Sequence, residues 1–188
     1  MREWIREFLM PVIRTDRLAL IPASVVLLDA ELESPEKFAQ LLDASVPAGW
    51  PPGEYDRPAI EYFRECLVAN PDAAGWYGWY AVLQPSQGGN ATVIGAGGYF
   101  GPPVDGVVEI GYSILTDFQR CGYATELVRG LMARAFSFPA VKRIIAHTHV
   151  GNYASIKVLE RCGFICDGPG EEAETVRYSL TRPIAGVV

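Results

Sequence analysis

The chain has 188 residues, of which 49% are hydrophobic and 20% charged, and its formal net charge is −6. This length predicts a single domain over residues 1–188 that buries a substantial core. The acidic balance argues against a general affinity for nucleic acid or an anionic membrane, and no stretch is long and apolar enough to span a bilayer. Residues 1–12 lack the continuous apolar region of a secretory signal, so we expect them to be an N-terminal extension of a cytoplasmic protein.

Strand and helix patterns follow one another along the chain. The first half predicts, in chain order, a strand over 17–21, helices over 25–32, 35–42 and 59–69, and strands over 76–83 and 92–100. The loop over 46–58 is rich in proline and glycine, and we expect Trp50 and Tyr55 to be exposed there. The second half predicts a strand over 107–115, a helix over 123–138, a strand over 143–148, a helix over 153–161, and strands over 164–167 and 175–180. This order predicts an α/β fold of the mixed α+β kind, with a mixed central sheet and helices on both faces.

The segment from Gln119 to Glu126 is the most informative part of the chain. It follows a strand pattern and leads into apolar residues at helical spacing, which predicts a short polar turn before a helix that opens on Gly122. The first N–H groups of a helix have no partner within the helix, and the helix dipole makes that end positive. Small residues at Gly122 and Ala124 allow a ligand to approach closely. The segment therefore predicts an anion cradle suited to a pyrophosphate.

Four motifs resemble, in order and spacing, those of the GNAT N-acetyltransferases and of their Rim-type branch. Gln119-x-x-Gly122-x-Ala124 resembles the family's cofactor loop. The other three are the first strand of Rim-type members over 15–20, the central strand over 108–112, and the late helix over 152–164, which ends in Gly-Phe. The resemblance runs from about residue 13 to residue 181, and it implies a mostly antiparallel sheet.

The resemblance implies acetyl-coenzyme A as the cofactor. In the family, strands 4 and 5 splay apart, here 107–115 and 143–148, and the pantetheine arm of the cofactor enters the gap between them. The amide groups of this arm can form hydrogen bonds with the backbone N–H and C=O groups that the splay leaves unpaired. The residues implied to contact the cofactor are Ile114, Leu115, Thr116, Gln119, Arg120, Cys121, Gly122, Tyr123, Ala124, Thr125 and Asn152.

Acetyl transfer requires a neutral amine. At pH 7 a lysine-like amine is neutral in roughly one molecule in a few thousand, and a protein α-amino group in roughly a tenth, so the former needs a base. The family's carboxylate on the central strand implies Glu109 as that base, acting directly or through water. The alternative is a structural or solvent-facing glutamate.

The departing thiolate needs a proton or a hydrogen bond. Many family members use a tyrosine seven residues after the asparagine of the late helix, and here that position is Leu159. The Rim-type pattern Asn-x-x-Ser instead implies Ser155 as the group near the thiol, with Asn152 on the same helix face. The alternatives are that Asn152 simply caps its helix and that Ser155 is a small helix residue.

The acceptor site is the least defined part of the chain. The resemblance implies Trp50, Tyr55 and Tyr112 as substrate-binding residues. An aromatic lining suits a cationic amine through cation–π attraction and suits an apolar peptide end equally well, so the acceptor is an amine-bearing small molecule or a protein N-terminus. His147 and His149 have no carboxylate spaced to complete a metal site, so we expect no metal and interpret both as core or surface residues.

Two functions stay open at this point. The first is an acetyl-coenzyme A-dependent N-acetyltransferase, a monomer or homodimer, in which the amine attacks the thioester directly. The second, kept open by the missing tyrosine, is a non-catalytic acyl-coenzyme A-binding regulatory module. A nucleotide-binding protein that uses the Gly122 turn is disfavoured, because no Gly-Lys-(Ser/Thr) follows that turn.

Overall fold

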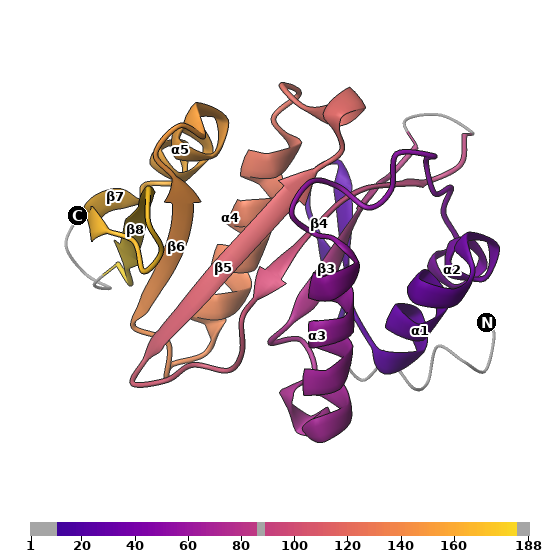
Figure 1. The fold of residues 1–188 in the computed structure, drawn as a ribbon, viewed down its shortest axis with the longest axis horizontal. Helices are drawn as coiled ribbons and strands as arrows, with labels where there is room; N and C mark the ends of the chain where they lie inside the picture. The colour runs from indigo at the N-terminus through magenta and orange to yellow at the C-terminus, as the bar shows by residue number, and fades with distance from the viewer. Residues whose placement is uncertain (1–10, 86–88, 184–188) are drawn as a thin grey trace.

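The structure, a computed structural model, describes residues 11–85 and 89–183, so most of the extension expected over 1–12 lies outside the described residues. The strands are β1 (Ile13–Arg14), β2 (Leu18–Pro22), β3 (Gly78–Leu83), β4 (Thr92–Tyr99), β5 (Val107–Ile114), β6 (Arg143–His149), β7 (Ile165–Pro169) and β8 (Thr175–Thr181). The α-helices are α1 (Val25–Glu33), α2 (Pro35–Leu42), α3 (Arg57–Ala69), α4 (Tyr123–Ser137) and α5 (Tyr153–Arg161). The described strands form one eight-stranded sheet in the order β1-β2-β3-β4-β5-β6-β8-β7 (Figure 1).

Every helix and strand that the sequence predicts is present, with boundaries that differ by at most two residues. The third helix begins at Arg57 because the Asp56 side chain accepts a hydrogen bond from the Ala59 N–H at 3.1 Å and so caps the helix. The prediction missed β1, which has only two residues, and the 3₁₀ turns η2 (Pro71–Ala73) and η3 (Thr116–Phe118). Elements this short carry too little periodicity to be seen in a sequence.

Neighbouring strands run antiparallel except for β5 and β6, which run parallel. The parallel pairing covers three positions, and its last pair is Glu109 with Ile145. Both strands continue past that pair, β5 to Ile114 and β6 to His149. Figure 1 shows the two strands close together at one end and diverging toward the other. The splay implied by the family resemblance is therefore present, and it begins at Glu109.

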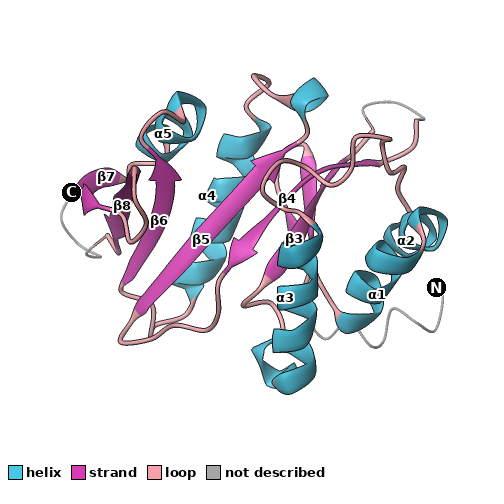
Figure 2. Ribbon diagram, viewed as in Figure 1, coloured by secondary structure: helices cyan, strands magenta, loops and turns pink. Residues whose placement is uncertain are grey.

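Helices cover both faces of the sheet (Figure 2). On one face, α4 packs its buried side chains, among them Leu127 and Leu131, against β2, β4 and β5, and Leu159 of α5 joins the same core. On the other face, α1, α2 and α3 form a second core with Tyr80 and Val82 of β3. No helix in the described ranges is long and apolar enough to cross a membrane.

The second core contains a carboxylate. Glu31 of α1 accepts hydrogen bonds from the Trp50 indole N–H at 2.8 Å, the Tyr55 hydroxyl at 2.9 Å and the Tyr80 hydroxyl at 2.6 Å. Burial raises the pKa of Glu31 from 4.5 to about 7, although these three hydrogen bonds act to lower it. The expectation that Trp50 and Tyr55 are exposed is wrong, because Glu31 draws both side chains inward and leaves Tyr55 8% exposed.

Glu31 predicts a pH-dependent stability. Between pH 4.5 and about 7 the folded chain holds a proton that the unfolded chain has released, so the contribution of Glu31 to the free energy of unfolding falls as the pH rises through this window. The loss from pH 5 to pH 8 is about 2–3 kcal/mol. Urea unfolding of the wild type and of Glu31→Gln at both pH values measures this loss. The glutamine does not titrate, so subtracting the pH dependence of the variant from that of the wild type leaves the contribution of Glu31 alone. Equal pH dependence in the two proteins would contradict the assignment.

Candidate active site

The splay leaves backbone groups of β5 without a partner strand. The Glu109 carbonyl accepts from the Phe100 N–H at 3.2 Å and the Leu115 N–H donates to the Ile94 carbonyl at 2.9 Å, so the odd-numbered residues of β5 direct their backbone groups toward β4. Backbone direction alternates along a strand, and Tyr112 and Ile114 therefore direct theirs into the gap beside β6, where no described strand pairs with them. A ligand arm carrying amide groups fits such an edge.

The predicted cofactor loop begins where β5 ends. Gln119 contacts the strand, because its side-chain amide donates to the Ile114 carbonyl at 2.9 Å. Gly122 is the N-cap of α4 and has φ 84°, a left-handed conformation that favours glycine. Side-chain oxygens cap α1, α2, α3 and α5, whereas α4, alone among the five described helices, has no side-chain cap. The first N–H groups of α4 are therefore available to an anion, as the sequence predicted.

An ion pair fixes this loop against the start of the sheet. Glu126 in the first turn of α4 accepts from the Thr15 hydroxyl at 2.6 Å and from the Arg17 N–H at 2.7 Å, and its other oxygen lies 2.7 Å from the Arg17 guanidinium. Burial acts to raise the pKa of Glu126, but these bonds outweigh it and lower that pKa. Arg17 also donates to the Cys121 carbonyl at 3.0 Å and lies over the Tyr123 ring. The glutamate stays ionised, and the loop is held before any ligand arrives.

A hollow of about 590 Å³ lies beside this loop. Its lining contains Gly122 and Thr125 of the predicted cofactor segment. Three arginines (Arg14, Arg17 and Arg129) and two carboxylates (Asp16 and Glu126) also line it, and Glu126 is paired with Arg17, which leaves an excess of one positive charge. Cationic side chains next to an uncapped helix N-terminus suit the phosphate groups of a nucleotide-type cofactor. Arg120 and Cys121 are both exposed at the tip of the loop.

Glu109 has a partner that the sequence did not reveal. His147 of β6 places its Nδ1 2.8 Å from Glu109 Oε1, and this contact joins the two strands just where they begin to separate. The Glu109 side chain is 31% exposed and that of His147 is 16% exposed. In the described part of the chain, the second ring nitrogen of His147 is buried without a hydrogen-bond partner. If the Nδ1–H donates to the carboxylate, the ring holds Glu109 in one orientation.

Ser155 lies on the opposite face of the sheet, together with Tyr112. The Tyr112 hydroxyl donates to the Ser155 carbonyl at 3.1 Å and lies 3.0 Å from the Ser155 hydroxyl. Burial raises the pKa of Tyr112 to about 12, so the phenol is protonated at neutral pH. Asn152 caps α5 by accepting from the Ser155 N–H at 3.1 Å, and Leu159 is fully buried. Tyr112, which the family resemblance implies for the acceptor, therefore contacts Ser155, a residue 43 positions away that no local pattern connects with it.

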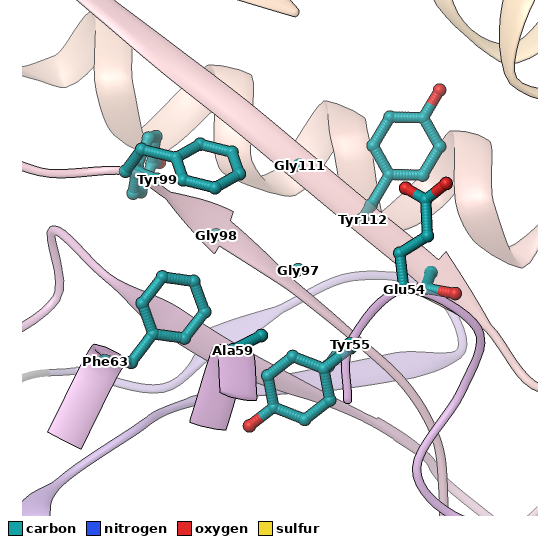
Figure 3. Close-up of a pocket in the computed structure, with 12 residues that line it drawn as sticks. Glu54, Tyr55, Ala59, Phe63, Gly97, Gly98, Tyr99, Gly111 and Tyr112 are labelled. Carbon is teal, nitrogen blue, oxygen red and sulfur yellow. The ribbon is translucent and has the colours of Figure 1, made fainter. Parts of the chain in front are cut away.

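A smaller cavity of about 120 Å³ lies on the Glu109 face, between α3, the loop before it and the strands β4 and β5 (Figure 3). Of the predicted substrate-binding residues, Tyr55 lines this cavity, whereas Trp50 is not part of its lining. Tyr112 borders it, yet Figure 3 shows the Tyr112 and Tyr55 hydroxyls directed away from the space between the side chains, in keeping with their bonds to Ser155 and Glu31. The full lining is Glu54, Tyr55, Ala59, Phe63, Ala96, Gly97, Gly98, Tyr99, Phe100, Gly111, Tyr112 and Ser113.

A splayed parallel pair followed by an uncapped helix defines a protein that binds an extended, phosphate-bearing cofactor. The model of the acetyltransferase (GNAT) domain matches residues 27–165. A Bacillus subtilis protein called uncharacterized N-acetyltransferase YjdG is 32% identical over 164 residues, which are 87% of this chain and 95% of that protein. The chain therefore belongs to the GNAT acetyltransferase family, and it is an N-acetyltransferase that uses acetyl-coenzyme A.

Solved structures show the same fold. An acetyltransferase from Agrobacterium tumefaciens superposes with a TM-score of 0.62 at 23% identity, covering 92% of this chain and 95% of that one. RimL, described as a ribosomal L7/L12 alpha-N-protein acetyltransferase in complex with coenzyme A, superposes with a TM-score of 0.61 at 18% identity and covers 91% and 98%. At these identities the superpositions show that the chain shares the fold of these acetyltransferases.

Gly122→Ala tests the cradle. A side chain at φ 84° strains the turn, and a Cβ there meets the Arg17 guanidinium at 3.4 Å, so we expect the Kd for acetyl-coenzyme A to rise about tenfold or more. Gly163→Ala is the matched control, because Gly163 also has a left-handed φ, of 88°, and lies after α5, outside the predicted cofactor segment. Calorimetric titration of both variants measures the effect. Equal Kd values for the two would remove Gly122 from the cofactor site.

Proposed function

We propose that the protein transfers the acetyl group of acetyl-coenzyme A to a primary amine by direct attack, with Glu109 as the base. The observation that carries this proposal is the Glu109–His147 contact of 2.8 Å at the point where β5 and β6 separate. A carboxylate held by a second side chain at the opening of the cofactor gap is placed to take a proton from an amine that enters there. Acetyl-coenzyme A supplies the acetyl group as a thioester.

The two faces of the sheet divide the chemistry. Glu109 faces the α3 side and Ser155 belongs to α5 on the α4 side, so the acceptor enters from the first side and the sulfur departs toward the second. The protonated amine loses one proton to Glu109, and the neutral nitrogen forms its bond to the acetyl carbon. As the carbon–sulfur bond breaks, the nitrogen loses its second proton, which goes to the departing sulfur to give the coenzyme A thiol, and the Ser155 hydroxyl donates a hydrogen bond to that sulfur. The N–H groups of Tyr112 and Ile114 that face the gap are available to the acetyl oxygen and to the pantetheine arm.

The proposed acceptor is the amine of a small molecule or a protein N-terminus. The acidic chain, with a net charge of −6, suits a cationic acceptor, and the likeness to RimL supports a protein N-terminus. We propose that the chain acts as a single domain, a monomer or homodimer, in the cytoplasm.

Glu109→Gln tests the base. We expect kcat for acetylation of an alkylamine, followed by thiol release, to fall about 10²–10⁴-fold while the Kd for acetyl-coenzyme A is unchanged. Raising the pH supplies neutral amine directly, so the deficit of the variant shrinks toward about pH 10. A variant as active as the wild type at pH 7 would remove Glu109 from the mechanism.

His147 is tested as a positioning residue. His147→Asn keeps an N–H near the position of Nδ1 and retains more activity than His147→Ala, whose kcat falls while its KM for the amine changes little. His149→Ala is the control, because His149 is exposed on the same strand and contacts Glu174. Equal activity of the Asn and Ala variants would show that the contact with Glu109 does not position the base.

A further inference from the structure

We infer that the 120 Å³ cavity is a specificity site that holds one compact apolar group of the acceptor. The preferred acceptor is then a primary amine with an aromatic or branched aliphatic group two or three bonds from its nitrogen. This inference rests on the proposed function and adds to it the class of amine.

The size and the lining of the cavity define the group that it holds. An apolar cavity of about 150 Å³ is large enough for benzene, so a volume of about 120 Å³ suits a single phenyl ring or a branched four-carbon or five-carbon group. Tyr55, Phe63 and Phe100 supply aromatic walls, and Ala59 leaves the space open on the α3 side. Glycine at 111 also leaves space, since a Cβ there would come within 3.1 Å of the Phe100 ring.

The cavity lies at a useful distance from Glu109. Side chains alternate along β5, so Glu109, Gly111 and Ser113 share one face, and Gly111 and Ser113 border the cavity. Two residues of a strand span about 7 Å. An amine held at Glu109 can place a group over Gly111 when two or three bonds join the group to the nitrogen. Such a link spans about 2.5–3.8 Å, and the length of the Glu109 side chain covers the rest of the distance.

The charges around the cavity favour a cation. Its lining contains the carboxylate of Glu54 and no lysine, arginine or histidine among the described residues. The next charged side chain along the same face of β5 is Glu109. An ammonium group is attracted by both carboxylates, whereas an acceptor that bears a free carboxylate near its amine is repelled. A free amino acid is thus a poorer acceptor than the corresponding amine or amide.

Two aromatic walls of the cavity, Tyr55 and Phe63, are formed before the acceptor binds. The Tyr55 hydroxyl is fixed by Glu31 at 2.9 Å, and the Tyr55 ring stacks on Phe63 with 6.4 Å between ring centres. Phe63 and Tyr55 are each 8% exposed, whereas Phe100 is 50% exposed. A site with two fixed walls loses little conformational entropy on binding, and the exposed Phe100 can adjust to groups of different shape.

The experiment compares acceptors that differ in one group. Thiol release is measured with 2-phenylethylamine, 3-methylbutylamine, ethylamine and putrescine, and we expect kcat/KM for the first two to exceed that for ethylamine and putrescine at least about tenfold. Ala59→Leu fills the cavity, so we expect kcat/KM for 2-phenylethylamine and 3-methylbutylamine to fall to within about twofold of the value that the same variant shows for ethylamine. Ala69→Leu is the matched control, because it makes the same change at an exposed position of α3. Equal kcat/KM for all four amines, or a preference that survives Ala59→Leu, would overturn the inference.

Two further measurements separate this inference from the proposed function. Calorimetric titration with 2-phenylethylamine, without acetyl transfer, reports the cavity alone, and we expect a Kd that rises at least about tenfold in Ala59→Leu. If binding is seen but no amine is acetylated, the proposed function fails and the cavity stands; if Ala59→Leu binds as tightly as the wild type, the cavity assignment fails. A peptide with N-terminal phenylalanine, compared with one beginning in glycine and with 2-phenylethylamine, distinguishes a protein N-terminus from a free amine as the source of the group.

Discussion

The site depends on the loss of strand pairing between β5 and β6. Three positions pair in parallel and hold the two halves of the sheet together, and then the strands separate while each keeps its other neighbour. Because β4 and β8 satisfy the outer edges, the separation exposes backbone groups without unfolding either strand. Strand alternation then sends Glu109 to one face and Tyr112 to the other. The separation of β5 from β6 thus creates the gap, and the alternation of side chains along β5 determines which residues lie on each face of the sheet beside that gap.

The second core links stability to the acceptor face. Glu31 is buried at a cost that its three hydrogen bonds only partly offset, as its raised pKa of about 7 indicates. Its hydrogen bonds hold the Trp50 and Tyr55 side chains in place, and Tyr55 forms one wall of the cavity beside β5. An amine acceptor becomes neutral as the pH rises, which is also the direction in which Glu31 stabilises the fold less.

The sequence predicted what local patterns and short motifs determine. Helical and strand periodicity located every long element, and the Gly122 turn predicted an uncapped helix start that the structure contains. Contacts between distant segments were beyond such reasoning. His147 lies 38 residues from Glu109, and their meeting depends on a strand register that no local pattern encodes. Tyr55 was expected at the surface because its loop is rich in proline, and its actual burial depends on Glu31, 24 residues away.

The position of Leu159 shows how the two faces cooperate. Its side chain is fully buried in the core under α5, so the late helix has an apolar residue where the family often has a phenol. The hydroxyl groups nearby come instead from Ser155 and from Tyr112, which reaches α5 from the splayed part of β5. These groups lie on the α4 side, whereas Glu109, His147 and the cavity lie on the α3 side. Tyr112 borders the cavity as well as Ser155, and the sheet separates the other members of the two sets. In the proposed reaction, side chains of α3 and its preceding loop can therefore change the acceptor specificity without contacting the groups proposed for the departing sulfur.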